Sequence, residues 1–261
     1  MMLEPGLVTA AALEAVRAAI RPGITTLELD SIAEQTIRDA GAEPNFMLEK
    51  GYHHTICASV NDDVVHGIPN TRVLESGDIV SIDCGAIVAG WNGDAAFTVV
   101  IADASRPALV AEREHLARVA DDSLWAGIAA LASARHLGEV GTAIEESIEN
   151  QGRFGILEEY SGHGIGRAMH EDPSVHNYRV RERGPRVKPG LVVAIEPMVT
   201  LGECGTFVRD DEWTVSTVDG SVAVHVEHSV AVHDAGIWVL TAPDGGAAGL
   251  ARYGVTPVPI A

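Results

Sequence analysis

The spacing of hydrophobic residues predicts two amphipathic helices near the N-terminus, over residues 7–20 and about 26–40. Ala, Leu, Val and Ile recur in both segments at intervals of three and four, which is the period of one helix face. A Pro-Gly pair at 22–23 ends the first helix. Thr25 or Thr26 is a suitable N-cap for the second, because a hydroxyl can accept a hydrogen bond from a free amide of the first turn.

Shorter apolar runs predict strands over most of the remaining chain. In chain order they cover 55–60, 79–83, 95–101, 192–200, 213–218 and 222–232. An Asp-Gly pair at 219–220 predicts a hairpin turn between the last two. A long helical region at about 107–151, with breaks at Gly138 and Gly141, separates the two groups of strands. This order predicts an α+β fold.

Two segments of the chain resemble each other. Residues 72–83 read RVLESGDIVSID, and residues 186–196 read RVKPGLVVAIE. Each copy ends on an acid at the end of a strand, and each is followed by a further acid on a later β segment. The repeat predicts two related halves that meet around a pseudo-twofold axis, with two acids from each: Asp83 and Asp94 from one, Glu196 and Glu227 from the other.

Composition places the chain among globular proteins. Of its 261 residues, 46% are hydrophobic and 21% are charged. No apolar run reaches the roughly 18 residues of a membrane span, and the N-terminus lacks the basic segment of a signal peptide. Three widely spaced cysteines predict a reducing compartment, with the cytoplasm as the default. A net charge of −19 argues against binding nucleic acid over the whole surface.

The segment 161–178, SGHGIGRAMHEDPSVHNY, concentrates glycine and histidine. His163 stands between Gly162 and Gly164, where the backbone can take conformations closed to other residues or lie close to a neighbouring strand. The glycines do not match a phosphate-binding fingerprint. An isolated Gly-His-Gly is typical of a tight turn. Alternatively, two helical turns or a returning strand bring His170 to the same place as His163, with one histidine on a metal and the other on substrate.

The four acids of the repeat are embedded in apolar sequence. A single acid in such a strand usually faces water at a sheet edge, whereas four buried together repel one another unless cations compensate. With His163 they offer four oxygen donors and one nitrogen, a set that suits divalent manganese, iron, cobalt or zinc. A metal pair of this kind generates a hydroxide nucleophile near neutral pH. Covalent catalysis is less favoured, because no Ser lies in a Gly-x-Ser-x-Gly turn and no Cys has an obvious neighbouring base.

With these motifs the chain resembles the type I methionine aminopeptidases, which have the pita-bread fold. The resemblance runs from the first helices to about Asp234. It rests on VVHGIP (64–69), GDIVSIDCGA (77–86), GWNGDAAF (90–97), SGHGIGRAMHEDP (161–173), AIEPMV (194–199) and VEHSVAV (226–232). The short interval between Glu196 and Glu227 leaves no room for the helical insertion of the type II enzymes.

The resemblance implies a role for each matching residue. Two divalent metal ions would be held by Asp83, Asp94, His163, Glu196 and Glu227, with Asp94 and Glu227 bridging them. His170 would stabilise the gem-diolate oxygen, and His66 would contact the scissile amide nitrogen. Glu196 would also carry the proton from the attacking water to the leaving amine.

The methionine pocket resembles one made of Tyr52, Cys57, Met169 and Trp213, although any one of these could be ordinary core. Two positions depart from the family. His53-His54 stands where Pro and a small residue are common, which puts the rim beside Tyr52 in doubt. Met169 stands where bacterial members often carry Phe, so it keeps the pocket apolar but makes it more pliable.

The expected function is removal of the initiator methionine from nascent chains with a small second residue. We expect one catalytic domain over residues 1–261, with a short helical lead-in and no extra domain, acting as a cytoplasmic monomer without membrane contact. The first alternative is a proline-directed peptidase of the same fold, which usually carries a large N-terminal domain. The second is a non-catalytic peptide- or histone-binding protein built on this fold, which typically lacks some of the five ligands.

A cluster of cations stands out in this acidic chain: Arg179, Arg181, Arg183, Arg186 and Lys188. Gly184 and Pro185 predict that the cluster lies on a loop, before the strand that leads to Glu196. One interpretation is that the cations pair with the surplus surface carboxylates. The other is a contact with ribosomal RNA near the exit tunnel, which the resemblance favours because the family works on emerging chains.

Overall fold

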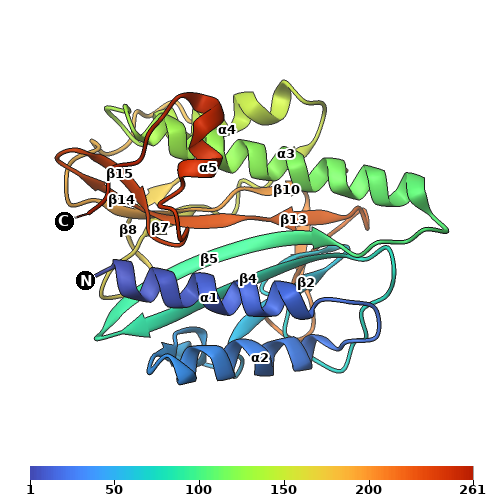
Figure 1. Ribbon diagram of the computed structural model, residues 1–261. Coiled ribbons are helices and arrows are strands. Elements are labelled where there is room, and N and C mark those ends of the chain that lie inside the picture. Colours follow the sequence, from blue (N-terminus) through green and yellow to red (C-terminus); the bar gives the residue numbers. More distant parts are fainter. Residues whose placement is uncertain (261) are drawn as a thin grey trace.

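Two pairs of helices flank a central β-sheet (Figure 1). The computed structural model describes residues 1–260. Its helices are α1 (Leu3–Ala19), α2 (Thr26–Asp39), α3 (Pro107–Leu131), α4 (Gly138–Glu149) and the short α5 (Ala247–Leu250), with 3-10 turns at Phe46–Leu48 and Ala251–Tyr253. α1 and α2 pack beside the early strands, and α3 packs with α4 beside the late ones. Each helix within residues 1–260 is too short or too polar to cross a membrane.

Both predicted N-terminal helices are present, and the first begins earlier than predicted, at Leu3. Thr25 is the N-cap of α2. Its side chain accepts a hydrogen bond from the Glu28 amide at 3.2 Å, and the Glu28 carboxylate accepts one from the Thr25 amide at 2.8 Å. This reciprocal pair satisfies two amides that the helix itself leaves free, which explains why α2 begins at Thr26.

The predicted break at Gly141 is wrong, although the one near Gly138 is correct. α3 ends at Leu131 and α4 begins at Gly138, so Gly141 lies inside α4. A Cβ atom at Gly141 would lie 2.4 Å from the Tyr178 carbonyl oxygen and 2.5 Å from that of His176. Gly141 therefore allows α4 to approach residues 176–178 closely, and it does not interrupt the helix.

Fifteen strands of residues 1–260 form three sheets. The strands are β1 (Glu43–Pro44), β2 (Ile56–Val60), β3 (Asp63–Val65), β4 (Ile79–Val88), β5 (Trp91–Val100), β6 (Gly155–Ile156), β7 (Gly162–Gly164), β8 (Glu171–Val175), β9 (Val192–Ile195), β10 (Met198–Thr200), β11 (Thr206–Val208), β12 (Val215–Thr217), β13 (Ala223–His225), β14 (Glu227–His233) and β15 (Gly236–Val239). The large sheet has the order β1-β4-β5-β14-β9-β7-β8, with β2 beside β4 and β15 beside β14. The two small sheets are β13-β10-β6 and β11-β12-β3.

Two predicted strands are each divided between two sheets. The segment 192–200 is β9 in the large sheet and then β10 in a small one, and the change falls at Glu196-Pro197. The segment 222–232 likewise changes from β13 to β14 next to Glu227. Pro197 has no amide hydrogen to continue a β ladder, which gives the first division a physical reason.

The hairpin predicted at 219–220 is also wrong. β12 pairs with β11 and β3, whereas β13 pairs with β10, so the strands on either side of the turn belong to different sheets. The Asp219 carboxylate accepts hydrogen bonds from the amides of Ser221 and Glu203. The Asp-Gly pair therefore turns the chain, as its composition predicts, without joining two paired strands.

The large sheet has two corresponding halves. The repeated segments lead into β4 and β9, and each of these strands pairs antiparallel with a partner, β5 or β14. One hydrophobic core lies under α1 and α2, and a second lies under α3 and α4. The halves meet where β5 pairs with β14 at Ala96↔Glu227 and Ala95↔His228. This β5–β14 junction places the acids of both halves side by side.

Candidate metal centre

The register of the large sheet places carboxylates on one face. Asp83 on β4 is opposite Ala96 on β5, and Ala96 is opposite Glu227 on β14. Side chains of directly opposed residues project from the same face of an antiparallel sheet. Asp94 precedes Ala96 by two residues and therefore shares that face. Ala96 contributes only a methyl group between Asp83 and Glu227, so both carboxylates have room.

Glu196 reaches the same place from the end of β9. It follows Ile195, whose partner on β14 is His228, so Glu196 comes to lie next to Glu227. Its Oε1 atom lies 3.4 Å from Nε2 of His163. The change of sheet at Pro197 thus sets the end of β9 and with it the position of this carboxylate.

His163 lies on β7, between β9 and β8. A Cβ atom at Gly162 would lie 2.3 Å from the Ala194 carbonyl oxygen, and one at Gly164 would lie 2.3 Å from that of Asp172. Of the two predicted reasons for glycine here, close approach is therefore correct. The prediction of a backbone conformation closed to other residues is wrong, because neither glycine has a positive φ.

The ring of His163 is held in one tautomer. Its Nδ1 atom lies 2.9 Å from the Gly164 carbonyl oxygen, which can only accept, so Nδ1 carries the hydrogen. The lone pair of Nε2 is then free to bind a metal ion, as in histidine ligands whose other nitrogen is hydrogen-bonded. Burial lowers the pKa of His163 to about 4, which keeps the ring neutral at pH 7.

The four carboxylates are buried together. Burial, with smaller effects from neighbouring acids, raises the pKa values of Asp94, Glu196 and Glu227 well above their ordinary range. Burial also raises the pKa of Asp83 to about 7, and the neighbouring Cys84 amide and Asp94 carboxyl only partly offset this rise. Within residues 1–260, one oxygen each of Asp83, Asp94 and Glu227 has no hydrogen-bond partner.

This arrangement fits divalent cations. No Lys or Arg of residues 1–260 forms an ion pair with these acids, and their nearest basic groups are histidines. Ligating atoms of Asp94, His163 and Glu227 all lie within 4.8 Å of one another. Buried acids without a counter-charge are strongly unfavourable, and a set of oxygens with one imidazole nitrogen is a typical site for a transition metal ion.

Two further histidines face this centre. The ring centroid of His170 lies 4.5 Å from that of His163, so the returning strand β8, and not a helix, brings these two rings together. His66 packs edge-on against Tyr160 and Trp213. It has a positive φ of 59°, which is uncommon for a residue other than glycine and is often found at functional sites. Burial and the proximity of His170 lower the pKa of His66 to about 4.

The predicted pocket residues form one apolar cluster beside the carboxylates. Tyr52, Cys57 and Met169 are buried together, and Trp213 packs against them, with its ring centroid 5.0 Å from that of Tyr52. Cys57 on β2 is opposite Asp83 on β4, which joins the cluster to the acids. The cavity that the cluster and the acids share has a volume of about 160 Å³.

The sequence reasoning missed four residues at this site, of which Val65 lines the cavity beside His66. Phe46 packs in the apolar cluster, and Glu49 lines the cavity. His225 is 2% exposed, and its Nε2 atom lies 3.7 Å from Glu196 Oε2 and 4.0 Å from Glu227 Oε2. That nitrogen has no hydrogen-bond partner within residues 1–260. Its position two residues before Glu227 was the signal that could have identified it.

The two histidines at the unusual rim position differ in their contacts. His54 Nδ1 lies 3.0 Å from the Asp30 carboxylate, which also accepts hydrogen bonds from the amides of Thr55 and Ile56. His54 therefore ties the loop after Tyr52 to helix α2. His53 is exposed, so it is the one of the pair that can alter the surface beside the cavity.

Comparisons with known proteins agree on one family. The sequence profile of metallopeptidase family M24 matches residues 1–234. The chain is 51% identical over 246 residues to methionine aminopeptidase 1 of Mycobacterium tuberculosis, covering 92% of this chain and 91% of that protein. The crystal structure of methionine aminopeptidase from Rickettsia prowazekii is similar with a TM-score of 0.85 and 33% identity, covering 92% and 95% of the two chains. A prolidase from Pyrococcus furiosus shares the fold, with a TM-score of 0.69 and 20% identity, and this chain covers 62% of its length.

Proposed function

The chain belongs to metallopeptidase family M24, and on that premise we propose that it removes the N-terminal methionine from peptides by metal-dependent hydrolysis. The observation that carries the proposal is the buried set of four carboxylates and His163 beside an apolar cavity. The family match and the methionine aminopeptidase relatives support it. Ligands come from both halves of the large sheet, which supports one catalytic domain over the chain.

The apolar cluster is suited to the methionine side chain. A cavity of about 160 Å³ is smaller than the roughly 300–1,000 Å³ of sites for drug-sized ligands, so it suits one side chain. Aromatic rings and sulfur atoms make favourable contacts with a thioether. Burial and the nearby Asp83 raise the pKa of the Cys57 thiol, so it stays neutral and acts as a small apolar wall.

The residues of the centre have two proposed roles in hydrolysis, metal binding and proton transfer. Asp83, Asp94, His163, Glu196 and Glu227 would hold a pair of divalent ions, with manganese, iron, cobalt and zinc all compatible with the donor set. Such a pair polarises a carbonyl group and lowers the pKa of water from about 15.7 towards about 7. Glu196 lies beside His163 and lines the cavity, where its carboxylate can accept the proton of the attacking water and return it to the leaving amine.

His170 and His66 act on the substrate. Both rings line the cavity, and the low pKa of His66 leaves its ring neutral at pH 7. A neutral imidazole can donate one hydrogen bond and accept another. We assign His170 to the oxygen of the tetrahedral intermediate and His66 to the scissile amide nitrogen. Tyr160 and Trp213, which pack against the His66 ring, keep it in place.

The biological substrate in this proposal is the nascent chain with a small second residue, processed in the cytoplasm. The three cysteines are free thiols, which is consistent with a reducing compartment. Work on emerging chains brings the protein to the ribosome, and Arg181, Arg183, Arg186 and Lys188 are the proposed contact, whereas Arg179 pairs with Glu146 at 2.9 Å. The proline-directed alternative has less support, because the prolidase resemblance is one of fold alone.

A comparison of two tripeptides tests the proposal. Chelated protein is titrated with manganese, iron or cobalt, and the release of the first residue is measured from Met-Ala-Ser and from Ala-Pro-Ser. We expect faster cleavage of Met-Ala-Ser. A norleucine peptide should also be cleaved, because a small change in an apolar side chain costs only about 1–3 kcal/mol, whereas Lys or Asp in first position should not be accepted. Faster cleavage of the proline peptide would overturn the proposal.

A further inference from the structure

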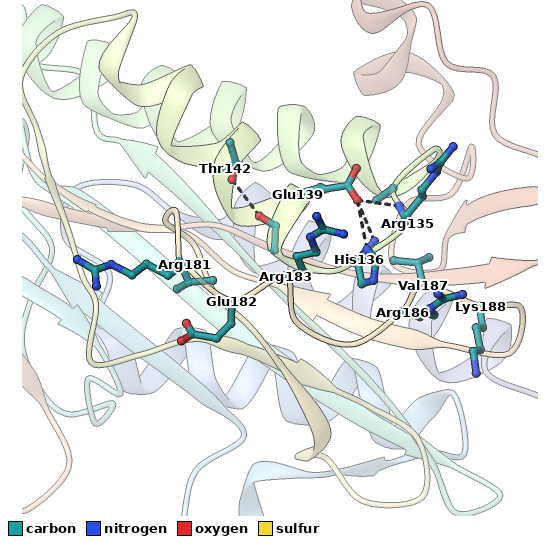
Figure 2. A pocket seen from close by; sticks show the side chains of 13 residues that line it. Arg135, His136, Glu139, Thr142, Arg181, Glu182, Arg183, Arg186, Val187 and Lys188 are labelled. Atoms are coloured by element: carbon teal, nitrogen blue, oxygen red, sulfur yellow. Dashed lines mark hydrogen bonds and ion pairs between the residues drawn. The ribbon is translucent and has the colours of Figure 1, made fainter.

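A large cationic groove lies away from the metal centre (Figure 2). It lies between the α3–α4 connection and the chain from Val180 to Lys188, and its volume is about 920 Å³. It shares no residue with the cavity at the carboxylates. Its cations are Arg135, Arg181, Arg183, Arg186 and Lys188, against two acids, Glu139 and Glu182. The groove is thus locally positive in a chain of net charge −19.

The cations of the groove are not paired with acids. Within residues 1–260, Arg179 pairs with Glu146 at 2.9 Å and so follows the surface-pairing interpretation. None of the five groove cations forms an ion pair there, and Figure 2 shows their guanidinium and ammonium groups without dashed contacts. The Glu139 carboxylate is occupied, because it accepts hydrogen bonds from the amides of Arg135 and His136. The unpaired cations of the groove therefore differ from the predicted cluster: Arg179 is not among them, and Arg135 is.

The backbone that carries these cations is fixed. The amides of Leu137 and Gly138 donate to the carbonyls of Pro185 and Arg183, each at 3.0 Å, and the Val187 amide donates to Arg135 at 3.1 Å. A Cβ atom at Gly138 would lie 2.9 Å from the Arg183 carbonyl oxygen, so glycine is required for this contact. A fixed backbone reduces the entropy lost when a ligand orders the groove.

The lining of the groove identifies the class of ligand. Four of its five cations are arginines, whose planar guanidinium groups match phosphate oxygens in pairs. Its only aromatic ring is that of His136, which faces Glu139 at 4.0 Å, so it offers no Phe, Tyr or Trp on which unpaired bases could stack. None of the large exposed hydrophobic residues of the chain lies in it, which disfavours a membrane or an apolar protein partner. A phosphate backbone in which the bases are already paired fits all three observations.

We infer that this groove binds the phosphodiester backbone of helical RNA. The inference rests on the proposed function only for the source of the RNA, since an enzyme that acts on emerging chains works beside ribosomal RNA. Arg135, Arg181, Arg183, Arg186 and Lys188 each contact a phosphate. Recognition depends on backbone charge and shape, so it is independent of base sequence.

Salt dependence of binding to a short labelled RNA duplex tests the inference, with fluorescence anisotropy as the readout. Each neutralised phosphate contributes about 0.9 to the slope of log affinity against log salt, so five contacts predict about −4.5. Affinity should then fall about 500-fold between about 50 and about 200 mM salt. The triple variant Arg181→Gln, Arg183→Gln, Arg186→Gln keeps two contacts, so its slope should be about −1.8. Its affinity should fall only about 12-fold over the same range of salt. Arg179→Gln is the matched control, and its slope should equal that of the unchanged protein.

Cleavage of Met-Ala-Ser is measured on the same samples, so that a failure of binding is distinguished from a failure of the proposed function. Intact cleavage also shows that the triple variant is folded. The inference is overturned if the unchanged protein does not bind the duplex at about 50 mM salt, or if the triple variant keeps the full slope. It is equally overturned if poly-glutamate at the same charge concentration competes as well as unlabelled duplex, because the groove would then bind any polyanion.

Discussion

Replacing Asp83 by Asn should stabilise the metal-free protein at neutral pH. Asp83 is buried, and its pKa is raised from 3.8 to about 7 because burial disfavours the charged form. The native state therefore holds a proton that the unfolded chain releases between about pH 4 and pH 7. The contribution of this proton to the free energy of unfolding is present in full below pH 3.8 and is lost as pH rises towards 7. Because Asn cannot ionise, the free energy of unfolding of the variant does not fall with pH in this way.

The size of the effect follows from the shift. Three pKa units at about 1.4 kcal/mol each correspond to about 4 kcal/mol at pH 7 and above. Unfolding entropy near 2.1 cal/mol/K per residue converts this to a rise in Tm of about 7 °C for a chain of this length. At about pH 4 the two proteins should have the same Tm. With saturating manganese the order should reverse, because the variant has lost a ligand while binding stabilises the unchanged protein.

Scanning calorimetry of chelated protein at a series of pH values from 4 to about 8 measures the difference directly. Asp94→Asn is the companion variant, since burial raises the pKa of Asp94 in the same direction. The reasoning is refuted if chelated Asp83→Asn is no more stable than the unchanged protein at pH 7, or if the difference between them does not grow with pH.

Three further substitutions test other parts of the site and fold. Glu196→Gln should lower turnover at least 10²–10⁴-fold in saturating metal, because we assign the proton transfer to this carboxylate; activity within tenfold of normal would contradict this. His225→Leu should weaken metal binding about 10–100-fold in calorimetric titration, which is the usual cost of losing a polar group beside the ligands, whereas His225→Gln keeps a donor and should bind almost normally. Gly162→Ala should cost about 1–3 kcal/mol in urea unfolding, because its Cβ would meet the Ala194 carbonyl oxygen at 2.3 Å. Gly205→Ala, with no atom nearer than 3.9 Å, is its control and should be near neutral.

The acids of the centre could be predicted from the sequence because their signal is local. Asp83 and Glu196 end apolar runs, and the repeat relates them to each other. The apolar runs themselves could not reveal where a strand leaves its sheet. At Glu196 the run continues past the acid to 200, and only Pro197 indicates that pairing stops. Which strands pair depends on contacts distant in sequence, so the Asp-Gly pair at 219–220 predicts a hairpin that the sheet pairing does not contain.

Glycine and histidine gave ambiguous signals for a related reason. Gly141 can end a helix or admit a close neighbour, and the neighbour here is a carbonyl from residues 176–178, far along the chain. His225 has the same apolar surroundings in sequence as an ordinary core residue, and only folding places its Nε2 between two carboxylates. The cationic loop could be located in advance, but the partner of Arg179 and the addition of Arg135 required the structure.

The junction between β5 and β14 also has a mechanical consequence. β4 and β5 are registered over ten residue pairs, whereas β5 and β14 are registered over two, at Ala95 and Ala96. In a thermal fluctuation, β5 and β14 should therefore separate from each other before the strands within either half separate. Asp94 comes from one side of the junction and Glu227 from the other, so metal ions held by both, as we propose, would cross-link the two halves. Amide hydrogen exchange at Ala95 and Ala96 would then report metal occupancy without any substrate.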